Sequence, residues 1–233
     1  MFFRGRGGRG ALMAERIIAI GDIHGCTPAL RAVLQAAEPR PGDTVVTLGD
    51  YVDRGPDTLG TLETLIDLSY RCRLIPILGN HDELLLQIVA GHHYLLGDWL
   101  MVGGDATLAS YGIEAPDEMP PEHVDFLRNC RAWYESKRHF FVHASYRPDL
   151  PLRRQPPELL RWEAISEMPP GPHRSGKIAV VGHTAQQNGE VLDWGYLKCI
   201  DTHVYGNGWL TALDLTTGQC WQADKFGGLR LPG

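Results

Sequence analysis

The chain has 233 residues, 43% of them hydrophobic and 21% charged, which is typical of a soluble globular protein with one large core. The formal net charge is −6 and no block of basic residues occurs, so we do not expect a nucleic acid partner. No apolar stretch approaches the roughly 18 residues that cross a bilayer, so we expect no membrane association.

The first residues and the cysteines bear on organisation and location. Met1–Leu12 is rich in Gly and Arg and has no apolar periodicity, which predicts a disordered tail before a single domain of residues 13–233. The cysteines are odd in number, scattered and without a Cys-x-x-Cys pair, which favours free thiols in a reducing cytoplasm. They are Cys26, Cys72, Cys130, Cys199 and Cys220, and we expect the first to pack rather than to bind a metal.

Apolar runs and turn residues predict alternating strands and helices through the first half. Thr27 is expected to cap a helix that continues to Ala37, Pro56 opens a second helix ending near Tyr70, and Glu83–Ala90 is a third. Repeated strand–helix–strand alternation predicts a layered α/β fold. The five predicted buried strands are Arg16–Ile20, Thr44–Leu48, Leu74–Leu78, Phe140–Val142 and Ile178–Val181.

The second half has weaker signals. His92–Trp133 reads as a helical insert that includes an amphipathic helix over Glu122–Asn129. Arg147–Pro172 contains seven prolines and is expected to be a long ordered loop across the site. The last three predicted strands, read as a β meander, are Lys198–Asp201, Trp209–Asp214 and Cys220–Ala223.

A short polar motif follows each of the five apolar runs, so the chain delivers carboxylate, amide and imidazole groups to the strand ends of one sheet. Such a donor set, without thiolates, suits two borderline divalent metals. The expected ligands are Asp22, His24, Asp50, Asn80, His143 and His183.

Asp50 is central in this set because a carboxylate offers two oxygens and could bridge two metals. Asp22 and His24 alternate by two positions and could face the first metal together. The remaining three ligands would complete the second metal. Any one of these motifs alone could be a simple turn, whereas five in succession after strands favour a metal site.

Three further residues fit the chemistry of phosphate esters. His81 lies one residue past a proposed ligand and suits a general acid that protonates the leaving oxygen. Asp53 could orient that imidazole, and Arg54 offers a two-pronged donor for phosphate oxygens. Each motif also precedes a helix start, where free N–H groups favour a bound phosphate. The remaining histidines, expected to be exposed or packed, are His92, His93, His123, His139 and His173.

The combined motifs resemble those of metallophosphoesterases of the serine/threonine phosphoprotein phosphatase type, especially compact bacterial and phage-like members. They are Gly21-Asp22-Ile23-His24-Gly25, Gly49-Asp50-Tyr51-Val52-Asp53-Arg54-Gly55 and Gly79-Asn80-His81, followed by His143 and His183. The resemblance covers Arg16 to Ala223. It implies the calcineurin-like fold, in which two mixed β-sheets pack face to face with helices on both outer sides.

The resemblance also implies site roles, position by position. Asp22, His24 and Asp50 match ligands of the first metal, and Asp50, Asn80, His143 and His183 match those of the second. Asp53 and His81 match the acid pair, and Arg54 matches a phosphate clamp alongside Asn80. Arg161 is our candidate for a second phosphate-binding arginine, and His203 and Tyr205 fall in a late loop that borders the site in relatives. The family's cofactor is usually manganese, with iron or zinc in some members.

Three functions remain open. We expect a dinuclear phosphomonoesterase that acts on phosphoproteins or small phosphate esters by in-line attack of a metal-activated hydroxide. The alternative is a symmetrical dinucleoside tetraphosphate hydrolase, because those relatives share Asp82 and Cys26, although they typically carry alanine where this chain has Asp53. A non-catalytic metal-binding scaffold is the third reading, and the presence of His81, Asp53 and Arg54 speaks against it.

Overall fold

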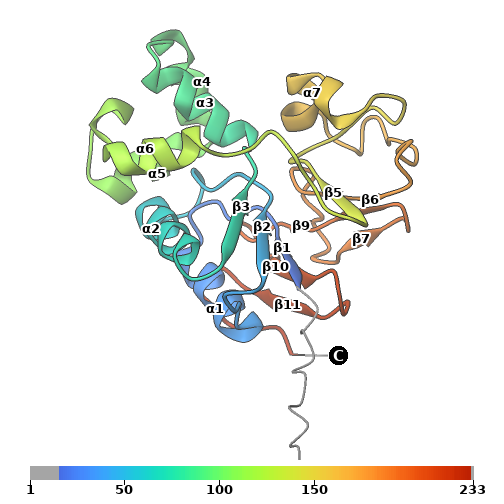
Figure 1. Cartoon of the computed structure of the whole chain (residues 1–233). Helices are drawn as coiled ribbons and strands as arrows, with labels where there is room; N and C mark the ends of the chain where they lie inside the picture. The colour runs from blue at the N-terminus through green and yellow to red at the C-terminus, as the bar shows by residue number, and fades with distance from the viewer. Residues whose placement is uncertain (1–15, 232–233) are drawn as a thin grey trace, which may run out of the picture.

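Two β-sheets pack face to face in the computed structural model, which describes residues 16–231 (Figure 1). The first sheet has the strand order β11-β10-β1-β2-β3, and β9 pairs with β10. Its strands are β1 (Ile17–Ile20), β2 (Thr44–Thr47), β3 (Arg73–Pro76), β9 (Asp201–Thr202), β10 (Trp209–Asp214) and β11 (Cys220–Ala223). The second sheet has the order β4-β5-β6-β8-β7. Its strands are β4 (Tyr134–Glu135), β5 (His139–Phe141), β6 (Ile178–Val181), β7 (Leu192–Asp193) and β8 (Leu197–Cys199).

Each sheet has a parallel centre and antiparallel edges. The strands β1, β2 and β3 are parallel, as are β5, β6 and β8, whereas β10 and β4 pair antiparallel to their neighbours. Parallel strands end at the same edge of their sheet, so the loops that follow them meet there. The predicted pair of mixed sheets is confirmed.

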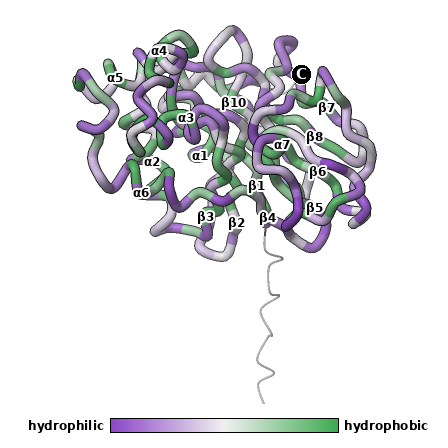
Figure 2. The backbone as a smooth tube through the Cα atoms, turned by 90° about the horizontal axis from the view of Figure 1, so that it is seen from above, coloured by the Kyte–Doolittle hydropathy of each residue, from purple (hydrophilic) through white to green (hydrophobic). Residues whose placement is uncertain are grey.

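Alternating side chains explain why the central strands are buried on both faces. Ile18 and Ile20 of β1 join the core beneath the helices, while Ala19 between them faces the second sheet. In β6 the same alternation places Val180 between the sheets and Val181 on the outer face. The hydrophobic residues therefore run along the central strands in Figure 2.

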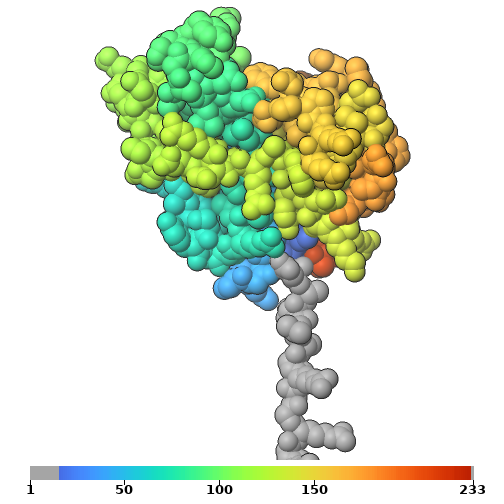
Figure 3. Space-filling model, turned by 45° about the horizontal axis from the view of Figure 1, so that its top comes forward, coloured from blue at the N-terminus to red at the C-terminus, as the bar shows by residue number. Residues whose placement is uncertain are grey.

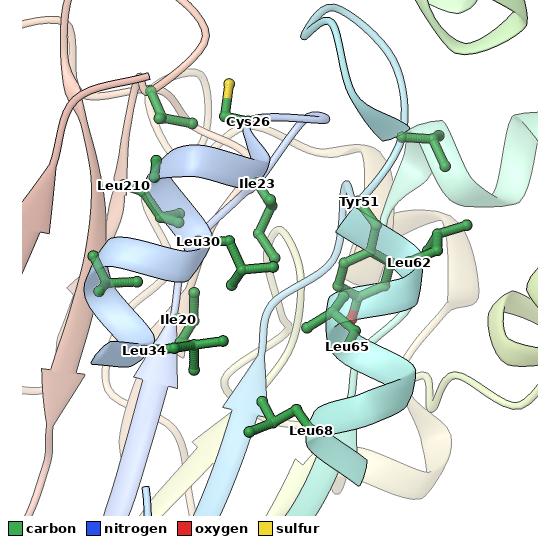
Figure 4. Packing of buried hydrophobic residues seen from close by; sticks show 14 of the residues in the cluster. Ile20, Ile23, Cys26, Leu30, Leu34, Tyr51, Leu62, Leu65, Leu68 and Leu210 are labelled. Carbon is green, nitrogen blue, oxygen red and sulfur yellow. The ribbon is translucent and has the colours of Figure 1, made fainter. Parts of the chain in front are cut away.

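Helices α1 (Thr27–Ala37) and α2 (Thr58–Ser69) cover the outer face of the first sheet, and α3 (Asn80–Val89) adds Leu85 and Ile88 to the same core from beyond the end of β3. Leu30 on α1 and Leu62 and Leu65 on α2 point into one shared core (Figure 4). All three side chains are fully buried, and each such burial stabilises the fold by about 1.5–3 kcal/mol.

The predicted helical insert is confirmed between α3 and β4. Its elements are a 3-10 turn (His93–Leu95), α4 (Leu96–Trp99), a π-helical turn (Leu100–Gly104), α5 (Asp105–Tyr111), a second 3-10 turn (Pro116–Glu118) and α6 (Pro121–Arg128). The amphipathic helix expected over Glu122–Asn129 corresponds to α6, whose Val124 and Leu127 are buried.

Helix starts differ from the predicted positions by a few residues. Helix α1 begins at Thr27 itself, with Cys26 at the cap. Helix α2 begins at Thr58 because Asp57 takes the capping position, where its side chain accepts from the N–H of Gly60 at 2.9 Å. Helix α3 begins at Asn80, so His81 and Asp82 lie in its first turn.

Two predictions for the second half are wrong. The segment expected to be a loop contains a 3-10 turn (Leu152–Arg154) and helix α7 (Pro157–Trp162), and Leu152 and Leu160 pack on the outer face of the second sheet. The expected final meander is split, because β8 pairs parallel with β6 in the second sheet and only β9, β10 and β11 form an antiparallel run. An apolar run predicts a strand but does not identify its partner.

The tail predicted over Met1–Leu12 lies outside the described residues. Within residues 16–231, no helix has both the length and the apolarity that crossing a membrane requires. All five cysteines are free, as predicted.

Candidate metal centre

Five loops at the carboxyl ends of β1, β2, β3, β5 and β6 carry the predicted ligands. Their backbones are unusual, because non-glycine residues with positive φ are uncommon. Among the described residues seven have this conformation, and all but Glu38 lie in or beside these loops: His24, Asp50, Asp53, Arg54, His183 and His203. Such strain concentrates at functional sites, where the surrounding structure holds it in place.

Asp50 lies at the centre of the cluster. Its Oδ2 is 3.4 Å from Nε2 of His24, and its Oδ1 is 3.5 Å from Nε2 of His143. The close approach of the β3 loop depends on Gly79, since a Cβ there would collide with the carboxylate of Asp50. Burial alone would raise the pKa of Asp50, but the surrounding imidazoles, His143 foremost, hold it well below its usual range. The two oxygens of this carboxylate therefore face two different groups of ligands.

Backbone carbonyls fix which nitrogen each imidazole presents. The Nδ1 of His24 donates to the carbonyl of Val52 at 2.9 Å, and Nδ1 of His143 donates to that of Leu48 at 2.8 Å. Burial lowers the pKa of both rings, that of His24 to about 3, so both are neutral at pH 7. Each Nε2 therefore presents a lone pair toward Asp50, which is the arrangement found in metal-binding histidines.

A second group of hydrogen-bond acceptor atoms lies around the side-chain oxygen of Asn80. His183 donates through Nε2 to the carbonyl of Trp162 at 3.1 Å, and burial lowers its pKa to about 4, so its Nδ1 carries a lone pair. This Nδ1 lies 3.0 Å from Oδ1 of Asn80, and Nε2 of His143 lies 2.9 Å from the same oxygen. These three acceptor atoms repel one another when nothing lies between them. A cation coordinated by all three would remove that repulsion.

Asp22 offers another oxygen without a partner. Its Oδ2 accepts from the N–H of His183 at 3.0 Å, whereas its buried Oδ1 has no hydrogen bond. Burial and the nearby carboxylates of Asp201 and Asp50 raise its pKa well above the usual range. Asp201 was not predicted to lie here, and burial raises its pKa to about 6. A cluster of buried carboxylates with an orphaned oxygen fits a bound cation, which would offset the mutual repulsion.

Within residues 16–231, two groups of donor atoms are compact enough to hold an ion. His24, Asp50 and His81 form the first, Asp50, His143 and His183 form the second, and the atoms of each group lie within 4.8 Å of one another. Asp50 is common to both. The second group agrees with the predicted set for one metal, whereas the first includes His81 where we expected Asp22. The oxygen and imidazole donors fit two divalent cations of the manganese, iron or zinc type.

His81 forms a tight pair with Asp53. Its Nδ1 is 2.7 Å from Oδ2 of Asp53, a fully buried residue that also accepts from Nε1 of Trp99 at 3.0 Å and from the hydroxyl of Thr107 at 2.8 Å. Burial would lower the pKa of His81, but the carboxylates of Asp50 and Asp53 outweigh it and raise the pKa above the ordinary value. The pair was predicted, whereas Trp99 and Thr107 were not.

Arg54 is exposed above the cluster. Its guanidinium donates to Nε2 of His24 at 3.1 Å and lies over the ring of Tyr205, 4.4 Å from the ring centre. The Tyr205 ring also contacts the rings of His24 and His203 edge-on. The late loop thus borders the site, as the resemblance implied.

Arg161 lies on α7 and reaches the other side of the cluster. It pairs with Glu83 of α3 at 2.6 Å, and its buried Nε has no partner. The other oxygen of Glu83 accepts from Nε1 of Trp162 at 2.7 Å. Glu83 was not predicted as a site residue, because its two partners lie 78 and 79 residues away in the sequence.

Asp82 and Cys26, two residues shared with the tetraphosphatases, have structural contacts. The carboxylate of Asp82 accepts from the N–H groups of Asp50 and Tyr51, both at 2.9 Å, and of Gly79 at 3.0 Å, which ties two motif loops together. Cys26 is buried in the core below α1, as predicted.

Fold and donor set together define a two-sheet α/β protein with a buried polar cluster suited to divalent cations. The pattern of the calcineurin-like phosphoesterase family matches residues 15–206, which is most of the chain. The chain belongs to this family.

Curated relatives match parts of the chain. A symmetrical bis(5'-nucleosyl)-tetraphosphatase of Vibrio cholerae is 36% identical over 139 residues, 58% of this chain and 47% of that protein. Serine/threonine-protein phosphatase 1 of Salmonella typhimurium is 39% identical over 92 residues, 39% of this chain and 40% of that protein. The match with the tetraphosphatase thus spans about half of its length.

Solved structures share the fold over almost the whole chain. A protein described provisionally as a diadenosine tetraphosphatase superposes with a TM-score of 0.68 at 23% identity, covering 95% of this chain and 96% of that one. A cold-active protein-tyrosine phosphatase of a Shewanella species gives 0.63 at 15% identity, covering 93% and 80%. At these identities the likeness concerns the fold alone.

Proposed function

We propose that this chain is a dinuclear metal hydrolase whose substrate is a dinucleoside tetraphosphate, cleaved symmetrically by water into two nucleoside diphosphates. The metal part rests on the lone pairs that converge on Asp50 and Asn80. The substrate part rests on relatives named for this activity, matched at up to 48% identity over shorter stretches. These relatives favour the alternative reading of the sequence over the phosphomonoesterase that we expected first.

Bound divalent cations, manganese by our expectation, would supply water activation and charge neutralisation at phosphorus. Asp22, His24, Asp50, Asn80, His143 and His183 are proposed to hold them. The chain's own residues would bind the phosphate oxygens and protonate the leaving oxygen. Arg54 is exposed, and we propose that the guanidinium N–H groups not bonded to His24 bind non-bridging phosphate oxygens.

His81 is proposed as the acid for the leaving oxygen. Its Nδ1 is occupied by Asp53, so the proton available for transfer is on Nε2, and the raised pKa keeps the ring protonated nearer neutrality. Neither Asp82 nor Cys26 would touch substrate, since both are taken up by loop and core contacts.

A phosphomonoester, including a phosphoserine peptide, is the second candidate because of Asp53. A carboxylate behind the acid helps to expel a poor alkoxide leaving group, and a nucleoside diphosphate leaves more easily. The buried Asp53–His81 pair at 2.7 Å is the observation that favours this candidate.

The test is to measure kcat/KM of the manganese-loaded protein on diadenosine tetraphosphate, p-nitrophenyl phosphate and a phosphoserine peptide. We expect the dinucleotide to give the highest value, with ADP as sole product. Higher values for both monoesters would select the second candidate. Full metal loading without turnover of any ester would instead support the non-catalytic scaffold.

A cytoplasmic location also remains our proposal. It is supported by the five free cysteines, three of them buried without a disulfide.

A further inference from the structure

Glu83 joins two consecutive residues of α7 to the metal-binding loop. It lies in the first turn of α3, three residues after Asn80, and its two carboxylate oxygens are used separately. One accepts from Arg161 at 2.6 Å and the other from Nε1 of Trp162 at 2.7 Å. The side chains of Glu83 and Arg161 are only 19% and 11% exposed, so solvent screens the ion pair weakly.

The end of α7 is also attached to the cluster through its backbone, because the carbonyl of Trp162 accepts from Nε2 of the proposed ligand His183 at 3.1 Å. Trp162 nevertheless remains 43% exposed. Because the only polar atom of this indole is bonded to Glu83, its exposed part is an apolar aromatic face. Figure 3 shows the green segment containing α3 and the yellow-to-orange segment containing α7 as neighbours on one face of the molecule.

We propose that Arg161 and Trp162 form one substrate subsite, locked in place by Glu83, in which the guanidinium binds a phosphate and the indole stacks on a planar ring of the esterified group. The free Nε–H of Arg161 supplies a donor that no residue uses. The ring would be a nucleobase in the dinucleotide or an aryl group in a synthetic ester. This inference rests on the proposed function for the position of the phosphate.

Equilibrium binding tests the subsite without relying on turnover. The probes are ADP and inorganic phosphate, titrated calorimetrically into the manganese-loaded full chain. Trp162→Leu should raise the Kd of ADP roughly 5- to 100-fold, the range of one lost base–aromatic stack, and leave that of phosphate unchanged. Trp162→Phe should retain most of the ADP affinity.

Glu83→Gln tests the lock, because the amide keeps the shape but loses the charge that holds Arg161. The Kd of both ADP and phosphate should rise roughly 3- to 30-fold, because the guanidinium would then lose its conformational freedom only when the probe binds. The matched control is Trp194→Leu, in the turn between β7 and β8, which should change neither Kd. Thermal melting and bound manganese would verify that each variant is folded and loaded.

An ADP affinity that is the same in Trp162→Leu as in the wild type would overturn the subsite, as would the absence of ADP binding to the wild type. Loss of ADP and phosphate binding to the same extent in Trp162→Leu would also overturn it, because the indole would then act only through Arg161. A wild-type protein that turns over no ester but binds ADP through Trp162 would refute the proposed function and leave the subsite standing.

Discussion

The carboxylate of Asp53 is fully buried and yet has a partner for each oxygen, with Trp99 and Thr107 on one side and His81 on the other. Burying such a charge is costly unless donors surround it. A residue held in this way has one orientation, so the imidazole of His81 has one too.

Asp53→Ala should therefore lower kcat more for poor leaving groups than for good ones. We expect roughly a 10- to 100-fold loss on a phosphoserine peptide and a smaller loss on diadenosine tetraphosphate, because the acid works harder when an alkoxide leaves. Steady-state kinetics on both substrates would measure it. Equal losses on the two would mean that Asp53 serves only the packing of His81.

The individual site residues were the part of the molecule most open to prediction from sequence. Asp22, Asp50 and Asn80 come two to four residues after the ends of β1, β2 and β3, so the parallel centre of the first sheet brings them together. Glu83 and Trp99 could not be predicted, because their partners lie 79 and 46 residues away and depend on how helices pack. Asp201 is a strand residue, as predicted, but its place beside Asp22 could not be predicted for the same reason.

The segment from α4 to α5 acts as a support for the second motif loop. Trp99 and Thr107 bond to Asp53, and the carbonyl of Gly103 accepts from the N–H of Arg54 at 3.0 Å. Gly103 has φ 112°, and a Cβ at this position would press on Arg54, so glycine is required. This helical insert therefore shapes the site although it contributes no proposed ligand.

Trp99→Phe should reduce kcat about 10-fold while manganese content stays near that of the wild type. The phenyl ring fills most of the space but cannot donate to Asp53, and loss of such a supporting bond typically costs 10- to 100-fold. Kinetics together with metal analysis would show it, and Trp133→Phe, outside the insert's contacts with Asp53, serves as the control. Unchanged kcat would assign the orientation of Asp53 to Thr107 alone.

The positions of helices and strands could be predicted where a local sequence pattern determines them. They could not be predicted where the pairing of distant strands determines them. The strands β1, β2, β5 and β6 are correct to within one residue, and β3 to within two, because buried apolar runs and turn residues bound them. Strand β8 was assigned to the wrong sheet, since its partner β6 is chosen by the packing of the two sheets. Helix α7 was missed because prolines dominate its surroundings, although proline at a helix start is favourable.

For the whole molecule, the metal cluster should govern activity. Chelation should abolish phosphatase activity, and manganese should restore it best, because every proposed donor is an oxygen or an imidazole. Asp50→Asn should lower metal content more than any other single ligand change, as this carboxylate faces both groups of donors. Metal analysis of dialysed variants would measure it. Full activity with no metal bound would refute the central proposal.

The free energy of unfolding should depend on pH through the ion pair of Arg16 and Asp43, which joins the start of β1 to the start of β2. Burial would raise the pKa of Asp43, but hydrogen bonds from Arg16 at 2.6 Å and from the N–H of Arg40 at 2.8 Å outweigh it and lower the pKa. Because the pKa of Asp43 is lower in the folded than in the unfolded state, its carboxylate stabilises the fold above the unfolded-state pKa of about 3.9. This stabilisation is lost as the pH falls through the folded-state pKa.

Asp43→Asn should therefore be less stable than the wild type by about 1–3 kcal/mol at pH 7. The difference should shrink as pH falls below about 4, when the wild-type carboxyl also becomes neutral. Urea unfolding of both proteins across this range would measure it. A difference that stays constant with pH would mean that shape, rather than charge, matters at this position.

The left-handed backbone at Arg54 lowers the stability of the fold, so selection for heat resistance alone would act against this side chain. Glycine adopts φ 68° without the cost, about 1 kcal/mol, that a side chain incurs there, and the two side-chain contacts of Arg54, with His24 and Tyr205, lie at an exposed residue. Arg54→Gly should raise Tm by a few degrees, whereas Arg31→Gly on exposed α1 should lower it. A screen for thermal stability alone would therefore favour a variant that has lost the proposed phosphate-binding guanidinium.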